Sequence, residues 1–223
     1  MAAPLRLAVL ASGRGSNLQA ILDAIGDGVL DATVVGVFSD RAGAKALERA
    51  RGAGIAAVAV TPAHFDSRDG FDAALFEAIE AVQPDLIVCA GYMRLLGAAQ
   101  VEAWKGRMIN IHPSLLPLFK GLRTHEQALA AGALEHGASV HFVSAELDGG
   151  PVIAQTRVAV VPGEDAAALA ARVLDREHPL LLATLGLFAA RRLRLDGGSV
   201  MLDGRRLARP LQLAGTELVE IEA

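Results

Sequence analysis

Residues 7–18 read LAVLASGRGSNL, an apolar run followed by a glycine-rich turn and the first residues of a helical pattern. This order is typical of the first strand, turn and helix of an α/β sheet. Glycine lets the backbone approach a ligand closely, and free N–H groups at a helix start favour an anion. The stretch therefore predicts an α/β fold with a phosphate site after the first strand, or else a plain turn in which Ser16 or Asn17 caps the helix.

Apolar runs alternate with helical patterns over most of the chain. We expect strands at residues 5–11, 33–38, 55–60, 85–90, 108–111, 139–143 and 152–160. We expect helices at residues 16–25, 42–52 and 68–82. The alternation predicts a Rossmann-like α/β fold, with a mostly parallel twisted sheet and helices on both faces.

The last third of the chain changes character. An Ala- and Leu-rich helical pattern covers residues 166–190, and Pro179 either interrupts it or lies in the first turn of a second helix. Residues 191–202 read as a hairpin around Asp-Gly-Gly, and no motif follows Pro210.

The composition narrows the class of protein. The chain has 223 residues, of which 52% are hydrophobic, and a net charge of −4. Its longest apolar stretch is well short of the ~20 residues of a bilayer span, and its start lacks a signal-peptide layout. The single cysteine, Cys89, excludes an internal disulfide. We expect a cytoplasmic protein without nucleic-acid or membrane partner, folded as one domain over residues 1–223 with halves of about 1–100 and about 101–223.

A set of chemically active residues follows two of the apolar runs. Residues 107–117 read RMINIHPSLLP. If the run before Pro113 is a strand, Asn110 and His112 point the same way, and Pro113 ends the strand. Asp148 follows the run 139–143 in a turn-forming Asp-Gly-Gly-Pro. Singly, each residue could be structural. Together, an amide donor, an imidazole and a carboxylate predict a site that transfers an acyl-type group.

The glycine loop differs from two common nucleotide motifs. Leu18 occupies the third-glycine position of the dinucleotide fingerprint, although Asp40 imitates the acidic ribose ligand of that fingerprint. No Gly-Lys-Ser/Thr follows the turn, which argues against a P-loop. The loop therefore favours a single phosphate monoester over a pyrophosphate.

Four segments stand in a characteristic order: Ser12-Gly-Arg-Gly-Ser-Asn17, Gly91-Tyr-Met-Arg-Leu-Leu96, Asn110-Ile-His-Pro-Ser-Leu-Leu-Pro117 and Glu146-Leu-Asp-Gly-Gly-Pro151. They resemble the motifs of the folate-dependent phosphoribosylglycinamide formyltransferase family, and the resemblance runs from Leu5 to about Arg206. It implies a formyltransferase fold. It also implies transfer of the formyl group of 10-formyltetrahydrofolate, a co-substrate, to the amino group of glycinamide ribonucleotide in purine synthesis, without a metal.

The resemblance also implies the roles of individual residues. Asn110 would donate to the developing oxyanion, His112 would donate a proton or stabilise the adduct, and Asp148 would favour the imidazolium and help to relay a proton. The nucleotide would be bound by Gly15, Ser16, Asn17 and Glu177. The folate would be bound by Arg68, Met93, Arg94, Leu95, Leu96, Asn110, Ser144 and Asp148. Catalysis would take place between the two halves.

The chain departs from the family pattern at two positions. Arg123 stands where relatives often carry a second histidine, so no catalytic role is expected for it. Leu174 stands where some relatives place a longer polar side chain near the phosphate, and Arg14 or Arg176 could compensate. His125 could lie near the substrate.

Four other functions remain as alternatives. A methionyl-tRNA formyltransferase or a formyltetrahydrofolate hydrolase would be expected to carry an additional domain. A nicotinamide-dependent dehydrogenase is disfavoured by Leu18. A non-catalytic nucleotide-binding module would leave Asn110, His112 and Asp148 unexplained. Nothing in the sequence indicates the oligomeric state.

Overall fold

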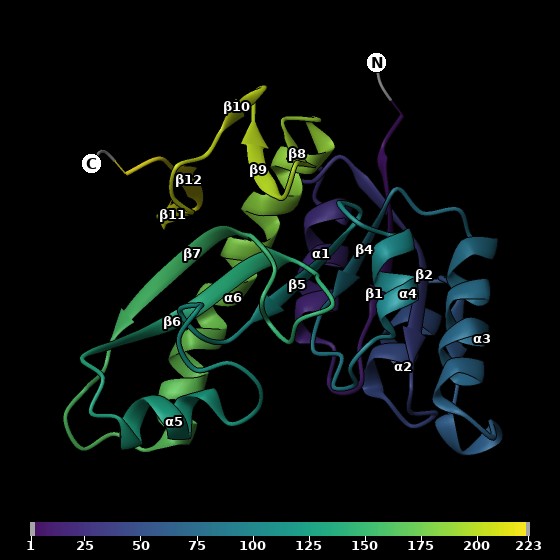
Figure 1. Ribbon diagram of the computed structural model, residues 1–223, viewed down its shortest axis with the longest axis horizontal. Coiled ribbons are helices and arrows are strands. Elements are labelled where there is room, and N and C mark those ends of the chain that lie inside the picture. The colour runs from purple at the N-terminus through teal and green to yellow at the C-terminus, as the bar shows by residue number, and fades with distance from the viewer. Residues whose placement is uncertain (1–2, 222–223) are drawn as a thin grey trace. The chain divides into compact units, whose positions relative to one another are not determined.

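The chain divides within strand β5, Met108–His112, into two units, with the boundary between Asn110 and Ile111. The computed structural model describes residues 3–221. In each unit, strands and helices pack together in a mixed α/β arrangement (Figure 1). The boundary falls somewhat later in the sequence than the expected one near residue 100.

The first unit contains a parallel arrangement of strands in the order β5-β4-β1-β2-β3. Its strands are β1 (Leu5–Leu10), β2 (Ala32–Ser39), β3 (Ala57–Ala59), β4 (Leu86–Cys89) and the first residues of β5. Successive residues Leu7, Ala8, Val9 and Leu10 are all fully buried. A strand buried on both faces is expected where helices cover both sides of a parallel sheet.

The helices of the first unit are α1 (Ser16–Gly26), α2 (Lys45–Gly52), α3 (Arg68–Ala81) and α4 (Ala98–Ala103), with a short 3₁₀ helix at Pro62–His64. In the sheet, β2 and β3 lie on one side of β1, and β4 and β5 lie on the other side. Right-handed crossovers therefore put α1 and α2 on one face and α3 and α4 on the other. The packing agrees, because α1 contacts α2 and α3 contacts α4.

The second unit is mixed in strand direction. Strand β6 (Glu135–Phe142) pairs antiparallel with β7 (Val152–Ala159), and β7 pairs parallel with β11 (Leu211–Ala214). Strand β12 (Glu217–Val219) follows antiparallel to β11.

Helix α6 (Ala166–Ala189) packs along β6 and β7 and contacts α5 (Thr124–Ala130). A separate small sheet contains β8 (Leu193–Asp196), β9 (Ser199–Leu202) and β10 (Arg205–Arg206), which confirms the expected hairpin.

Helix α6 is continuous, and the prediction that Pro179 interrupts it or begins a second helix is wrong. A proline inside a helix removes one hydrogen bond and crowds the preceding turn. The buried residues of α6 nevertheless keep one helical period on both sides of Pro179: Leu169, Val173, Glu177, Leu180, Leu181, Thr184, Leu185 and Phe188. Burial of this continuous stripe offsets the local cost of the proline.

Six of the described elements were not predicted from the sequence: the 3₁₀ helix at Pro62–His64, α4, α5, β10, β11 and β12. Strand β6 also begins at Glu135, before the expected start at residue 139. The extra residues include Gly137, which weakens a strand pattern. A Cβ at Gly137 would lie 1.9 Å from the carbonyl oxygen of Thr156, so the close approach of β6 and β7 requires glycine there. Within residues 3–221, no helix is both long and apolar enough to span a membrane.

Removal of the α6 cap is expected to destabilise the fold. The side chain of Asp165 precedes the helix and accepts a hydrogen bond from the N–H of Ala168 at 2.8 Å. Asp165→Ala should lower the free energy of unfolding by about 1 kcal/mol, measured by urea denaturation. Asp165→Asn keeps an acceptor and should retain most of the stability. Equal loss in both variants would contradict the capping role.

Candidate active site

Strand β5 carries two of the three residues expected to act in catalysis. Asn110 and His112 are two positions apart, so their side chains leave the same face of the strand. The strand is one residue longer than expected and includes His112. It ends there because Pro113 has no N–H for the next ladder bond.

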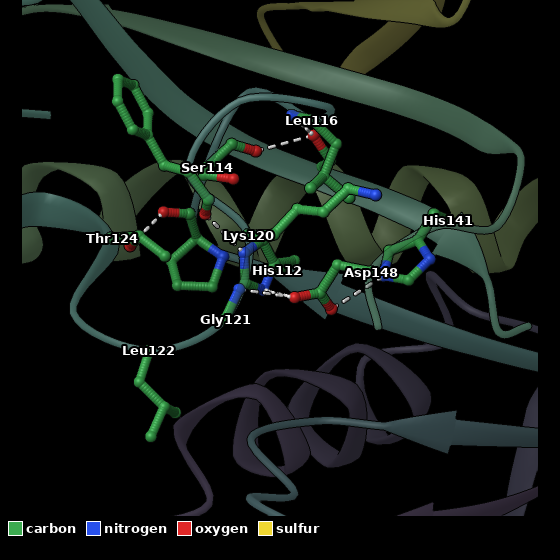
Figure 2. A network of polar contacts seen from close by, with 12 residues as sticks. His112, Ser114, Leu116, Lys120, Gly121, Leu122, Thr124, His141 and Asp148 are labelled. Carbon is green, nitrogen blue, oxygen red and sulfur yellow. Dashed lines mark hydrogen bonds and ion pairs between the residues drawn. The ribbon is translucent and has the colours of Figure 1, made fainter. Parts of the chain in front are cut away.

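The imidazole of His112 lies between a backbone carbonyl and a carboxylate. The residue is only 6% exposed. Its Nε2 atom lies 3.1 Å from the carbonyl oxygen of Phe119, and because a carbonyl can only accept, Nε2 carries the hydrogen. Its Nδ1 atom lies 3.6 Å from Oδ2 of Asp148. Figure 2 shows the ring of His112 beside this carboxylate.

Both oxygens of Asp148 have partners. Oδ2 accepts a hydrogen bond from the N–H of Gly121 at 2.8 Å, in addition to facing His112. Oδ1 lies 3.7 Å from Nε2 of His141 (Figure 2). The side chain of Asp148 is 9% exposed, so this carboxylate is held almost entirely by the protein.

His141 is a residue of this cluster that the sequence reasoning missed. It lies on β6 and is buried, and its Nδ1 donates to the carbonyl of Phe142 at 2.9 Å. Burial lowers the pKa of His141, while the nearby charge of Asp148 acts in the opposite direction. A usable signal existed, because His141 stands in the apolar run that leads to Asp148.

The turn that carries Asp148 depends on a glycine and on an ion pair. Asp148 has φ of 45°, in the left-handed region. A Cβ at Gly150 would lie 1.8 Å from the carbonyl oxygen of Phe142, so no side chain fits there. Glu146 accepts from Lys120 Nζ at 2.7 Å. The turn is thereby joined to the segment that contains Gly121.

Hydroxyl groups hold the loop that follows His112. Ser139 Oγ donates to the carbonyl of Ser114 at 2.7 Å and accepts from the N–H of Leu116 at 3.0 Å. Thr124 Oγ1 donates to the carbonyl of Pro113 at 2.6 Å. These contacts connect the loop to β6 and to the start of α5.

His125 is paired with another histidine. Its Nδ1 lies 3.1 Å from Nε2 of His136, which is fully buried on β6. Burial, reinforced by the neighbouring imidazoles, lowers the pKa of His136 to about 4. Burial also lowers the pKa of His125. The pair is therefore neutral near pH 7 and braces α5 against β6.

The glycine loop of the first unit contains an uncapped helix start. Gly15 is the N-cap of α1, with φ of 71° and no side-chain hydrogen bond at the cap. Ser16 and Asn17 lie inside the helix, so neither is the capping residue that the plain-turn alternative requires. A Cβ at Gly15 would lie 2.8 Å from Cα of Ala46, whereas a Cβ at Gly13 would meet nothing within 4 Å. The loop therefore needs glycine at Gly15.

The structure brings together several residues expected to bind folate. Nη2 of Arg68 donates to the carbonyl of Leu95 at 2.9 Å, and Nε of Arg68 lies 3.5 Å from the buried carboxylate of Asp72. Burial raises the pKa of Asp72, although Arg68 acts against this shift. Met93 and Leu95 are more than half exposed. Arg68 thus borders an apolar surface made by Met93, Leu95 and Leu96.

Two other expected ligands lie in the second unit. Glu177 is buried on α6, and Ser144 Oγ donates to the carbonyl of Glu146 at 3.2 Å.

Two arginines were named because the chain departs from the family pattern. Arg123 is the N-cap of α5, with φ of 57°. Nε of Arg176 lies 3.4 Å from Thr156 Oγ1.

Among residues 3–221, no group of three or more His, Cys, Asp or Glu side chains is arranged to hold a metal ion.

A protein-family model described as "Formyl transferase" matches residues 5–185. The chain belongs to the formyl transferase family.

Two relatives are similar to this chain over nearly their whole length. The phosphoribosylglycinamide formyltransferase of Escherichia coli strain K12 is 48% identical over 203 residues, which cover 91% of this chain and 96% of the relative. A structure of phosphoribosylglycinamide formyltransferase from Coxiella burnetii is 48% identical, with a TM-score of 0.89, and the match covers 92% of this chain and 96% of that one.

A solved structure of a protein that is named for a different activity is also similar to this chain. A formyltetrahydrofolate deformylase from Pseudomonas putida has a TM-score of 0.79 at 27% identity, and the match covers 89% of this chain and 70% of that one.

Substitution of the two loop glycines should have different effects. Gly15→Ala forces a side chain into the left-handed region, which costs about 1–2 kcal/mol, and into contact with Ala46. Gly13→Ala meets open space and serves as the control. We expect Gly15→Ala alone to lower both the free energy of unfolding and the affinity for glycinamide ribonucleotide, measured by urea denaturation and calorimetry. Equal behaviour of the two variants would contradict this account of the loop.

Acid should destabilise the second unit through His136. Its folded pKa of about 4 lies below the unfolded value of ~6.5, so the unfolded state takes up the proton first. The stability that His136 contributes is therefore complete above pH 6.5 and is lost as the pH falls toward 4, by at most about 3 kcal/mol. Urea denaturation across this range should show a smaller pH slope in His136→Asn. An unchanged slope would exclude His136 as the cause.

Proposed function

We propose that this chain transfers the formyl group of 10-formyltetrahydrofolate to the amino group of N1-(5-phospho-D-ribosyl)glycinamide. The products are the formylglycinamide ribonucleotide and tetrahydrofolate, and the step belongs to purine synthesis. Similarity to phosphoribosylglycinamide formyltransferases over nearly their full length carries the proposal. The buried pair of His112 and Asp148 supports it as the chemical centre.

The reaction needs charge stabilisation and the movement of one proton. The substrate amine attacks the formyl carbon, and the carbonyl oxygen of the formyl group becomes an oxyanion. The amide of Asn110 is suited to donate to this oxyanion. The attacking nitrogen must then lose a proton, and N10 of the folate must gain one as the carbon–nitrogen bond breaks.

His112 and Asp148 are suited to this proton transfer. Nδ1 of His112 faces Asp148, so the carboxylate stabilises a positive charge on the ring during the reaction. Nε2 is the atom left for substrate, and it acts once the carbonyl of Phe119 yields its place. The N–H of Gly121 keeps the carboxylate in position.

We assign the residues that bind the two substrates from the chemistry of the site and from the resemblance to the family. The uncapped start of α1 supports phosphate binding by Gly15, Ser16 and Asn17, since helix N–H groups and the helix dipole favour an anion. Glu177 would accept from the ribose hydroxyls.

The folate would lie against Met93, Arg94, Leu95 and Leu96, with Arg68 at the border of this apolar surface. By the same resemblance, Asn110, Ser144 and Asp148 would also bind the folate. The folate is a co-substrate, and the proposed mechanism uses no metal. A cytoplasmic location and catalysis between the two units stay predictions.

Hydrolysis of the formyl folate is the second candidate, and the similarity to a formyltetrahydrofolate deformylase favours considering it. The two reactions differ in the acceptor, which is an amine in one and water in the other. Donor consumption that requires glycinamide ribonucleotide distinguishes the transferase from the hydrolase.

Loss of either member of the buried pair should abolish most turnover. We expect His112→Ala and Asp148→Asn to lower kcat by about 10²–10⁴-fold, because each removes general acid–base chemistry. A spectrophotometric formyl-transfer assay measures the effect. His64→Ala removes an exposed histidine of the first unit and should leave turnover unchanged. Near-wild-type turnover of both active-site variants, with both substrates bound normally, would refute the catalytic assignment.

A further inference from the structure

Ser12 forms hydrogen bonds to two different segments of the first unit. Its hydroxyl donates to Oδ1 of Asp40 at 2.5 Å and accepts from the N–H of Met93 at 3.0 Å. Its own N–H donates to the carbonyl of Gly91 at 3.0 Å. Ser12 is 2% exposed and Asp40 is 7% exposed, so water competes little for these bonds.

These contacts lie where the strand order reverses. Ser12 follows β1, Asp40 follows β2, and Gly91 follows β4. Strand β1 lies between β2 and β4, so a side chain at its carboxyl end can reach the segments after both neighbours. Open α/β sheets bind ligands at such a reversal. Ser12 therefore connects the start of the proposed phosphate loop to the segment that contains Met93.

Asp40 determines the direction in which the hydroxyl of Ser12 points. A serine hydroxyl has one proton and two lone pairs, and it rotates freely without a strong acceptor. The carboxylate of Asp40 takes the proton, which turns a lone pair toward the N–H of Met93. The charge of Asp40 also contributes, after burial, to the raised pKa of Tyr92, the residue before Met93. Asp40 thus lies beside the segment that it orients.

We infer that Ser12 and Asp40 are positioning residues for the folate site: Asp40 orients Ser12, and Ser12 fixes the backbone of Met93. The inference rests on the proposed function, which assigns residues 93–96 to the folate. Arg68 holds the same segment at its other end, through the carbonyl of Leu95. The apolar surface is thereby held at both ends before any folate arrives, and a preorganised surface binds more tightly.

The test compares the KM values for the two substrates in four variants. Ser12→Ala should raise the KM for 10-formyltetrahydrofolate about tenfold, equivalent to about 1.4 kcal/mol, while the KM for glycinamide ribonucleotide and kcat change by less than about twofold. Asp40→Ala should raise the folate KM by a smaller factor. Asp40→Asn keeps an acceptor for the hydroxyl and should restore a value close to wild type. Ser39→Ala is the control, because Ser39 is a buried serine that accepts from Arg41 and not from Met93.

Amide hydrogen exchange tests the contact independently of turnover. The N–H of Met93 should exchange slowly in the wild-type protein and at least about tenfold faster in Ser12→Ala. This measurement also applies to any variant whose activity is too low to assay, provided that it is folded.

Three outcomes would overturn the inference. One is a folate KM in Ser12→Ala that matches that of Ser39→Ala. Another is an equal rise of both KM values, which would indicate general damage to the loop. The third is unchanged exchange at Met93. A wild-type protein with no formyl transfer to glycinamide ribonucleotide would instead refute the proposed function, while the exchange experiment would still test the positioning contact.

Discussion

Burial of a carboxylate costs free energy unless donors and cationic groups surround it. Asp148 accepts a hydrogen bond from the N–H of Gly121, and its two oxygens face the imidazoles of His112 and His141. Each partner comes from a different segment, so the loop after β5, strand β6 and the turn after β6 must all take defined positions. The tight approach of Gly150 to β6 and the pair of Lys120 with Glu146 serve the same placement. The arrangement proposed as the chemical centre is in this sense a consequence of placing one buried charge.

In the first unit, the order of the strands brings the interacting segments together. Its strands run parallel, and their carboxyl ends bring together segments that are far apart in the sequence. Ser12, Asp40 and Gly91 each lie within two residues of the end of a strand, and their hydrogen bonds are possible only because β1 lies between β2 and β4. The helix start at Gly15 lies only a few residues beyond Ser12. One strand order therefore determines the positions of both the proposed phosphate loop and the segment that contains Met93.

Much of this architecture could be predicted from the sequence, because strands buried on both faces produce apolar runs and loops produce glycines. The differences between the predicted and the observed elements have physical reasons. Gly137 interrupts the pattern of β6 because the neighbouring carbonyl leaves no room for a side chain. Pro179 suggests a break that the burial of α6 overrides. Strand β11 pairs with β7 from far along the chain, and no local pattern encodes such a partner.

The candidate site likewise contains residues that the sequence predicts and residues that it does not. Two short motifs predict the roles of Asn110, His112 and Asp148, and the proximity of His112 and Asp148 follows from the fold. The position of His141 in the run that leads to Asp148 was a signal, but its contact with Asp148 also depends on which face of β6 meets the turn. The expected roles of Arg68 and Leu95 stay predictions, but their direct hydrogen bond explains why two such distant residues would serve one ligand.

The strands β11 and β12 have a consequence for association between molecules. An unpaired strand edge offers its backbone N–H and carbonyl groups to any other chain that can add a strand. Strand β11 occupies that position beside the middle of β7. The next strand, β12, is only three residues long and begins with the exposed Glu217, which makes it a poor template. The last segment of the fold thus covers part of the β7 edge and ends the sheet of the second unit on a short strand, and a chain without it would also expose the backbone of Ala154 and Gln155 to pairing with another chain.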